Sequence, residues 1–478
     1  MDERRIIGLD LGIASEHTAR VLNGEGKVVA KRRAVPTTES LSALESAALE
    51  GASPETVLEV VMEPTGPAWL PIAVFFISRG HRVFRVPSAK AHDMRRYFSR
   101  HAKSNSIDAD ALAKLAIIDP EGLRLLVLDD ADGAALDRRV RACDRLTQEA
   151  SLHKRRIKDL VRQLLPMTPL TGDLGLADLA VLERWADPHD LVNAGKTRLT
   201  RVIVTASHGQ QKAERAEEWL AAARSALELY GEHPSVAFAD LAAEVATEVR
   251  LLKAINVELA LHEQPREQRY RSVDPEQLAR SLPGIKTIGG PALVATMGRA
   301  ARFPSAAHFR SFTGLAPKAS ETANTDRKGQ AMSKAGNSLL RTTLIRAADH
   351  ARKEDPQLAR IYYVQMTERG KTHLAAECVV AAHLAERAWL VMRRGTPYLR
   401  RDIDGGVVTL QEAKAIIAEH STVSEDVRRR QRSNKGGKAP QKVLEEHLKP
   451  HAKGVGRTRR PSPSTTPARS EIAVKRTA

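Results

Sequence analysis

The segment over residues 5–12 most constrains the fold of this chain, because an apolar run ends there in a single carboxylate. The run leads into Asp10, and Gly12 then turns the chain. This pattern is typical of a buried strand whose polar end opens onto a site. A second apolar run, over residues 57–62, ends in the same way at Glu63. The sequence thus places one acid at the end of each of two predicted strands.

Two further acids follow on a predicted helix. Asp108 lies among apolar positions that would face the sheet, and Asp110 follows two residues later, on another face of the helix. Acids at strand ends, with another on a helix, are how a ribonuclease-H-like fold assembles a divalent metal site. Converging carboxylates without basic partners bind cations or become protonated, and hard oxygen ligands select Mg²⁺ or Mn²⁺. The alternative interpretation of each acid is an ordinary cap or turn residue, which we favour for Asp110.

The first part of the chain alternates strands and helices after an opening meander. This order predicts a mixed α/β sheet in a metal domain over residues 1–125. The expected strands cover 17–22, 27–32 and 81–86 in addition to the two acid-bearing runs, and the expected helices cover 41–49 and 68–79.

Long helical patterns predict an arm over residues 130–270. Apolar residues recur at three- and four-residue spacing over about 134–165 and again over about 213–261. Two such helices around a smaller insert predict an antiparallel coiled coil. A plain helical bundle without chemistry is the alternative for this arm. The fold class is therefore α/β plus α, with a mainly helical C-terminal domain over residues 275–405.

The charge of the chain favours a nucleic-acid partner. The formal net charge is +17, and residues 430–478 contribute +10 of it, so the rest of the chain is only moderately basic. We expect residues 425–478 to be a basic disordered tail, because their composition cannot form a core. No signal peptide or membrane-length apolar segment is evident, which predicts a cytoplasmic, nucleoid-associated protein. The two cysteines exclude a disulfide framework.

A glycine-bounded hairpin between two predicted helices is a candidate for contact with a nucleic-acid backbone. It spans residues 282–293 and includes Gly284, Lys286 and Gly289. In a helix-hairpin-helix, backbone N–H groups and the next helix N-terminus point at a phosphate. A tight turn without ligand is the alternative.

A polar loop with several cations follows the hairpin. Ser320 lies in this loop and could act as a nucleophile, although most loop serines are hydrogen-bonding turn residues. Lys328 precedes a Ser-Lys-Ala-Gly-Asn segment that contains Lys334 and leads into a basic helix with Arg341. We expect these cations to contact DNA phosphates.

In their order along the chain, these segments resemble one family, the DEDD-type insertion-sequence transposases, also called bridge-RNA-guided serine recombinases. The resemblance covers about residues 5–400. The motifs that carry it are the strand with Asp10, Glu63-Pro64-Thr65-Gly66, Lys103-Ser104 leading to Asp108-Ala109, the helical arm, Leu282-Pro283-Gly284-Ile285, the Phe309 to Pro317 segment, Ser320, and Ser333 to Arg341.

The resemblance implies a RuvC-like metal domain, a coiled-coil arm and a C-terminal transposase domain with a catalytic serine. Asp10 and Glu63 match the first two acids of the family, and Asp108 matches the last. The third acid falls on Asn105, whose neutral oxygen can still face a metal. Ser320 matches the nucleophile, which would form a covalent 5′-phosphoserine with DNA.

Glu321 stands where the family usually has a glycine after the serine, which leaves Thr322 and Ser333 as lesser candidates for the nucleophile. The expected partners are the DNA of the element ends and the target, a structured non-coding guide RNA, and further copies in a homodimer or homotetramer, with no membrane.

We therefore predict a transposase that cleaves and rejoins DNA with Mg²⁺, with three alternatives. A RuvC-like nuclease or junction resolvase would use water in place of serine. An actin-like ATPase or sugar kinase also opens with a strand-Asp-Leu-Gly hairpin, but would need later phosphate- and adenosine-binding glycine turns. A degenerate transposase would only bind nucleic acid, an alternative that Asn105 supports.

Overall fold

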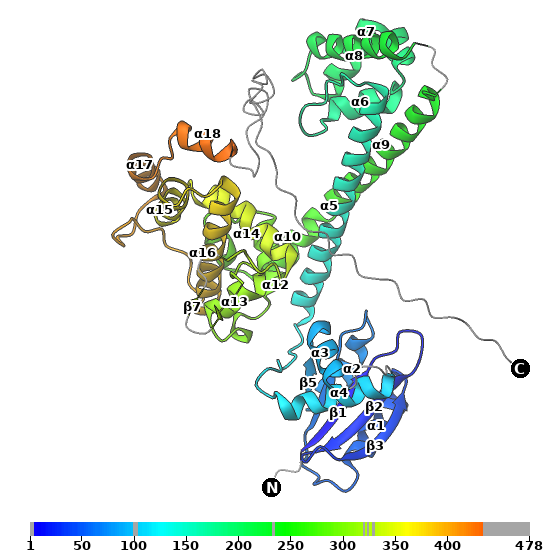
Figure 1. The fold of residues 1–478 in the computed structure, drawn as a ribbon, viewed down its shortest axis with the longest axis vertical. Helices are drawn as coiled ribbons and strands as arrows, with labels where there is room; N and C mark the ends of the chain where they lie inside the picture. The colour runs from blue at the N-terminus through cyan, green and yellow to red at the C-terminus, as the bar shows by residue number, and fades with distance from the viewer. Residues whose placement is uncertain are drawn as a thin grey trace, which may run out of the picture. The chain divides into compact units, whose positions relative to one another are not determined.

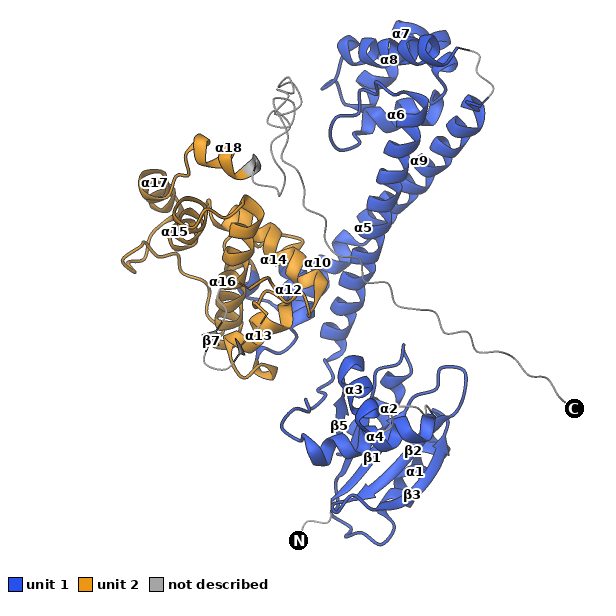
Figure 2. Ribbon diagram, viewed as in Figure 1, with its two compact units in different colours: residues 1–279, 290–300 blue, residues 280–289, 301–478 orange. Residues whose placement is uncertain are grey.

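The computed structural model describes residues 4–98, 104–231, 235–318, 321–322, 325–326 and 330–433. The chain forms two compact units (Figure 2). The first, residues 1–279 with 290–300, contains the sheet and a long helical arm, and the second, residues 280–289 with 301–478, contains the C-terminal helices. Among the described residues, no helix is long and apolar enough to cross a membrane.

A five-stranded mixed sheet forms the N-terminal part of the first unit (Figure 1). Its order is β3-β2-β1-β4-β5, in which β2 pairs antiparallel with β1 and β3, and β4 pairs parallel with β1 and β5. The predicted mixed α/β sheet is confirmed. The strands are β1 (Arg5–Asp10), β2 (His17–Asn23), β3 (Val28–Ala34), β4 (Leu58–Met62) and β5 (Arg82–Arg85).

Helices cover both faces of this sheet, because β1 and β4 are apolar on both sides. Ile7 packs in the core beneath α1 (Thr38–Leu49) and α2 (Trp69–Ser78), together with Leu44 and Phe76. Ile6 faces the opposite way, into the core that includes Leu112. That second core is closed by α3 (Ser88–Phe98) and α4 (Asn105–Ile118). A strand buried on both faces reads as a continuous apolar run, which is the pattern that the sequence carries.

The arm is an antiparallel pair of helices, α5 (Ala131–Leu164) and α9 (Phe238–Leu261), followed by α10 (Glu263–Val273). His153 on α5 lies 2.5 Å from Glu248 on α9, and Arg269 on α10 pairs with Asp132 at the start of α5, so the chain returns along α5. The predicted antiparallel pairing is observed, whereas the supercoil of a true coiled coil stays a prediction. Pro166 follows soon after the end of α5, where it cannot continue the helix.

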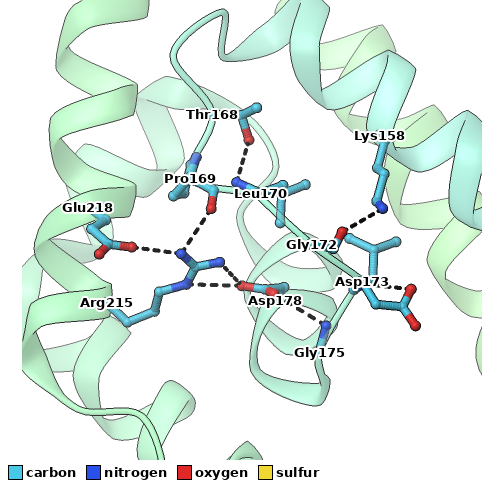
Figure 3. Close-up of polar contacts among 11 residues, drawn as sticks. Lys158, Thr168, Pro169, Leu170, Gly172, Asp173, Gly175, Asp178, Arg215 and Glu218 are labelled. Carbon is cyan, nitrogen blue, oxygen red and sulfur yellow. Dashed lines mark hydrogen bonds and ion pairs between the residues drawn. The ribbon is translucent and has the colours of Figure 1, made fainter. Parts of the chain in front are cut away.

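Three helices between α5 and α9 pack on the arm, and the single helical block expected over 213–261 is divided into α8 and α9. They are α6 (Leu176–Arg184), α7 (Pro188–Ala206) and α8 (Ala213–Tyr230). The loop before α6 is anchored by Arg215 of α8, whose guanidinium donates to Pro169 O at 2.9 Å and contacts Asp178 at 2.7 Å and Glu218 at 2.6 Å (Figure 3).

The second unit is built around α16, against which α13, α14 and α15 pack. Helix α16 spans His373–Arg394. The other helices of the C-terminal half are α11 (Leu278–Ser281), α12 (Gly289–Met297), a 3₁₀ turn Ala300–Arg302, α13 (Ala306–Thr313), α14 (Ser338–Ala351), α15 (Pro356–Tyr363), a π-helical turn Val364–Glu368, α17 (Leu410–His420) and α18 (Glu425–Ser433). Two short strands, β6 (Glu321–Thr322) and β7 (Thr325–Asp326), pair antiparallel.

The segment 425–433 forms α18 and so departs from the disorder expected of a tail beginning at residue 425. The side chain of Ser424 accepts a hydrogen bond from Val427 N, and Glu425 and Asp426 occupy the first turn, where acids complement the helix dipole. Residues 434–478, the rest of that tail, lie outside the described residues.

Candidate active site

The first two acids lie at neighbouring strand ends. Asp10 is the last residue of β1, and Glu63 directly follows β4. Because β1 and β4 are parallel and Leu9 is registered with Met62, the next position on each strand holds one of the two carboxylates. Both residues are partly exposed. The topology therefore brings together two acids that are 53 residues apart in the sequence.

The close packing of α4 on β1 brings the helical acid toward the same strand. A Cβ atom on Gly8 would lie 2.0 Å from Ala109 O and 2.4 Å from Ala113 N, so the helix rests directly on the strand backbone. Ser104 caps α4 by accepting a hydrogen bond from Ile107 N at 3.3 Å. Asp108, in the first turn, immediately precedes the residue that lies over Gly8.

The Asp108 carboxylate is only partly satisfied. Its Oδ1 atom is buried without a hydrogen-bond partner, and its Oδ2 atom lies 3.5 Å from Nη1 of Arg95 on α3. A buried carboxylate oxygen without a donor is costly unless a cation or proton is added. Carboxylate oxygens are the ligands that Mg²⁺ and Mn²⁺ prefer, although Asp10, Glu63 and Asp108 are not among the described residues whose ligand atoms gather within 4.8 Å of one another. Sequence reasoning did not identify Arg95 as a neighbour of this acid.

Asn105 lies in different surroundings. It is exposed and, with Ser104 and Ser106, lines a hollow of about 630 Å³ whose opposite wall comes from β2 and β3. Thr18, on that wall, is the antiparallel partner of Asp10, so the hollow begins beside the strand end. The other wall residues are mostly basic: Arg20, Lys31, Arg32 and Arg33, with Glu16. The run Lys31-Arg32-Arg33 on an edge strand is the sequence signal for this basic wall.

The turn after Asp10 and the carboxylate of Asp110 each have a local partner. His17, at the start of β2, is buried, which lowers its pKa, and its Nδ1 accepts a hydrogen bond from Gly12 N at 3.2 Å. This bond fixes the turn after Asp10. Asp110 forms an i,i+4 ion pair with Lys114 at 2.7 Å, which agrees with the interpretation of this acid as a surface residue.

The Gly284 hairpin packs tightly against its own unit. Gly284 has φ +75°, and a Cβ there would lie 2.2 Å from Ala347 O of α14. Its N–H lies 3.3 Å from an oxygen of Glu354, and Lys286 lies 3.6 Å from the same carboxylate. Gly284 therefore has a clear packing role, and the predicted contacts of the hairpin with DNA stay a prediction.

Two backbone hydrogen bonds join the segments on either side of the loop that is expected to carry the nucleophile. Lys318 N donates to Ala331 O at 2.9 Å, and Ser333 N donates to Ala316 O at 2.8 Å. Ser320 and Lys328 lie outside the described residues. Among the lesser candidates, Thr322 belongs to β6, and Ser333 Oγ lies 3.5 Å from Gly314 O.

Lys334 lies in the segment that precedes α14, and Arg341 lies near the start of that helix. Lys334 is exposed and adopts φ +56°. Arg341 Nη1 donates to Lys334 O at 3.0 Å and lies 3.4 Å from Thr313 O. Asn337 caps the helix by accepting a hydrogen bond from Leu340 N at 2.9 Å. Nη1 of Arg341 thus holds the backbone at Lys334 in place.

A second acidic cluster lies in the C-terminal unit. One ligand-type atom from each of Asp349, His373 and Glu377 lies within 4.8 Å of the others. Arg352 and Lys353 lie 2.5 and 2.9 Å from the two oxygens of Asp349. Burial and a hydrogen bond with Asp349 raise the pKa of Glu377 to about 7. Because cations already pair with Asp349, we interpret this cluster as an internal charge network.

Comparison with known proteins decides the family. A family model described as "Transposase", of DEDD type from IS110, matches residues 7–166, which contain the four positions Asp10, Glu63, Asn105 and Asp108. A second, "Transposase IS116/IS110/IS902 family", matches residues 276–363. The chain belongs to the IS110 family of transposases. The predicted resemblance to the DEDD-type insertion-sequence transposases is therefore confirmed.

A curated relative is similar in sequence to this chain over most of its length. It is the "Insertion element IS110 uncharacterized 43.6 kDa protein" of Streptomyces coelicolor, 28% identical over 406 residues, or 83% of this chain and 95% of the relative. Membership implies an enzyme that acts on DNA during transposition of an insertion sequence. The alternative of an actin-like ATPase or sugar kinase is thereby set aside.

Proposed function

We propose that this transposase cleaves and rejoins the strands of an insertion sequence through a Mg²⁺- or Mn²⁺-dependent acidic site and a serine nucleophile. The observation that carries the proposal is the position of Asp10 and Glu63 at adjacent parallel strand ends, with Asp108 on the helix packed over β1. The unpartnered buried oxygen of Asp108 supports a cation at this site. Asp10, Glu63, Asn105 and Asp108 would hold it.

The proposed cleavage step exchanges one phosphodiester bond for another. The Ser320 oxygen bonds to the phosphorus while the bond from phosphorus to the 3′ oxygen of the neighbouring nucleotide breaks. The serine loses its proton, the leaving oxygen gains one, and a 5′-phosphoserine and a 3′-hydroxyl result. A cation bound by the acids would neutralise charge on the phosphate. Rejoining reverses these bond changes with a new 3′-hydroxyl.

We propose that the basic wall facing Asn105 binds the DNA backbone beside this site. Arg20, Lys31 and Arg32 line the hollow, and the carboxylate of Glu16 lies 3.5 Å from Arg33. Such a surface attracts phosphate without reading sequence. Gly284, Lys286, Gly289, Lys328, Lys334 and Arg341 are proposed as further DNA-binding residues. A structured guide RNA and a homodimer or homotetramer, together with location at the nucleoid, complete the proposal by family resemblance.

The deciding experiment traps the covalent intermediate. The wild-type protein is incubated with element-end DNA, the structured non-coding RNA proposed as its guide and Mg²⁺, then quenched in denaturant and examined for DNA-linked protein. We expect an adduct that disappears in Ser320→Ala and in Asp10→Asn, but persists in Ser333→Ala. Cleavage without an adduct, unchanged in Ser320→Ala, would show that the enzyme uses water. An inert wild type that Asn105→Asp restores would identify a degraded transposase.

A further inference from the structure

A basic pocket lies at the C-terminal end of α16, and all of its lining residues except Gln357 lie outside the segments matched by the two family models. It has a volume of about 260 Å³ and lies entirely within the second unit. Three arginines line it, Arg387, Arg394 and Arg401, and none of its described lining residues is acidic. The other described lining residues are uncharged and include Gln357, Pro397 and Leu399. Such a lining favours an anion with an apolar part.

The local interactions leave charge in this pocket uncompensated. Arg387 Nη2 donates to the neutral Gln357 Oε1 at 2.9 Å, whereas its buried Nη1 has no hydrogen-bond partner. Arg401 Nη1 donates to a backbone carbonyl, that of Gly405, at 2.6 Å. An unsatisfied guanidinium nitrogen is costly when buried, and an added anion would provide the missing acceptor after a small rotation.

The nearby acids are occupied by other donors. Asp355 is fully buried, and it accepts hydrogen bonds from the Tyr398 hydroxyl at 2.6 Å and from Leu358 N at 2.9 Å. Asp402 accepts from Gly406 N at 2.6 Å. These contacts fix the loop that follows α16 and leave the three arginines without a carboxylate partner in the described part of the chain.

Stabilisation of the helix end explains only part of this arrangement. Arg394 lies in the last turn of α16, where a cation complements the helix dipole. Arg387 lies two turns earlier, and Arg401 lies beyond the helix, so neither is placed by that effect. The helix dipole therefore accounts for the position of Arg394 alone.

We propose that this pocket binds a backbone phosphate of the DNA on which the transposase acts. Arg387, Arg394 and Arg401 would contact the phosphate oxygens, and the apolar wall at Pro397 and Leu399 would pack against the sugar. Planar guanidinium groups match phosphate geometry. The proposal rests on the action of the family on DNA and is independent of the serine chemistry proposed above.

The test measures binding of a fluorescently labelled DNA duplex by anisotropy over a range of salt concentrations, with EDTA to prevent cleavage. The triple variant Arg387→Gln, Arg394→Gln, Arg401→Gln removes the pocket charge. The double variant Arg394→Gln, Arg401→Gln changes only exposed side chains and so preserves folding. The control triple Arg360→Gln, Arg369→Gln, Arg429→Gln removes the same charge elsewhere in the unit.

We expect the pocket triple to weaken binding about tenfold at about 150 mM salt and to reduce the log–log salt slope by about one, because the loss of one phosphate contact removes roughly 0.9. The double variant should show a smaller loss in the same direction. Equal effects of the pocket and control triples would overturn the proposal, as would loss of binding to a structured RNA with DNA binding unchanged. Because EDTA prevents metal-dependent cleavage, this result does not depend on the outcome of the covalent-adduct experiment, so the two proposals can fail separately.

Discussion

Asn105 and Asp108 show how two neighbouring positions acquire different surroundings. They lie one turn apart on α4, yet Asn105 is exposed on a basic hollow, whereas Asp108 carries a buried oxygen without a hydrogen-bond partner. Their spacing in the sequence predicts only that they share a helical face. The neighbours that distinguish them, Arg20 and Arg95, come from a strand and from another helix.

At this scale, we predict that Asn105→Asp tightens Mg²⁺ binding about tenfold, because it adds a charged oxygen ligand to the proposed site. Isothermal titration of the variant and the wild type with Mg²⁺ would measure the change. Asp110→Asn is the matched control, since its carboxylate pairs with Lys114, and it should leave affinity unchanged. Equal affinities of Asn105→Asp and the wild type would exclude residue 105 from the metal site.

Glu377 makes stability depend on pH. Its pKa of about 7 in the folded protein exceeds the ordinary value of 4.5, so folding favours the protonated form. This contribution is complete below pH 4.5 and is lost as pH rises through 7, at a cost on the order of 2 kcal/mol. Asp349 stays ionised over this window, because hydrogen bonds from Lys353 and Arg352 outweigh burial and lower its pKa.

We therefore predict that Glu377→Gln removes much of the loss of stability between about pH 5 and pH 8, since glutamine cannot ionise. Urea unfolding at several pH values would measure it. Glu368→Gln, at an exposed ion pair with Arg360, should keep the wild-type dependence. Parallel pH profiles for Glu377→Gln and the wild type would contradict the assignment.

At the scale of elements, the seating of α4 on β1 positions the helical acid. Gly8 permits this contact, because a side chain there would overlap the helix backbone. The apolar run predicted a strand around Gly8 but not which helix would lie on it. That contact joins residues about 100 positions apart, and no local pattern encodes it.

Gly8→Ala should accordingly lower the free energy of unfolding by about 3 kcal/mol, because overpacking forces backbone shifts. It should also weaken Mg²⁺ binding by displacing α4. Gly172→Ala is a suitable control, since no atom lies within 4 Å of its added Cβ. Denaturant unfolding compares the two, and equal stabilities would contradict the close contact.

The helices packed on the arm contain a buried ion pair, between Arg215 of α8 and Asp178 of α6, whose loss should be costly. Arg215→Ala would leave Asp178, which is 4% exposed, without its guanidinium partner (Figure 3). We expect a loss of about 3 kcal/mol in the free energy of unfolding, measured with urea. Lys196→Ala, which breaks the exposed pair with Glu217, should change stability by less than about 1 kcal/mol. Similar losses in both variants would contradict this prediction.

At the scale of the whole molecule, positive charge is concentrated near the C-terminus. Residues 434–478 carry 11 Lys or Arg against 3 Asp or Glu. We predict that a protein ending at residue 433 binds DNA more weakly and with a shallower salt dependence, while its Mg²⁺ affinity is unchanged. Anisotropy at several salt concentrations measures the slope. An unchanged slope would show that these residues make no backbone contacts.

Local sequence patterns predicted the two acid-bearing strands, helix α5 and the family. Apolar runs ending at Asp10 and Glu63 predicted their strands, periodic apolar residues predicted α5, and the motif order indicated the transposases, because each signal is local or depends only on order. The tertiary structure decided the strand register beside Asp10, the seating of α4 over Gly8, and the convergence of Arg387 and Arg401. Those features depend on long-range packing, which places residues in contact that no short stretch of sequence relates.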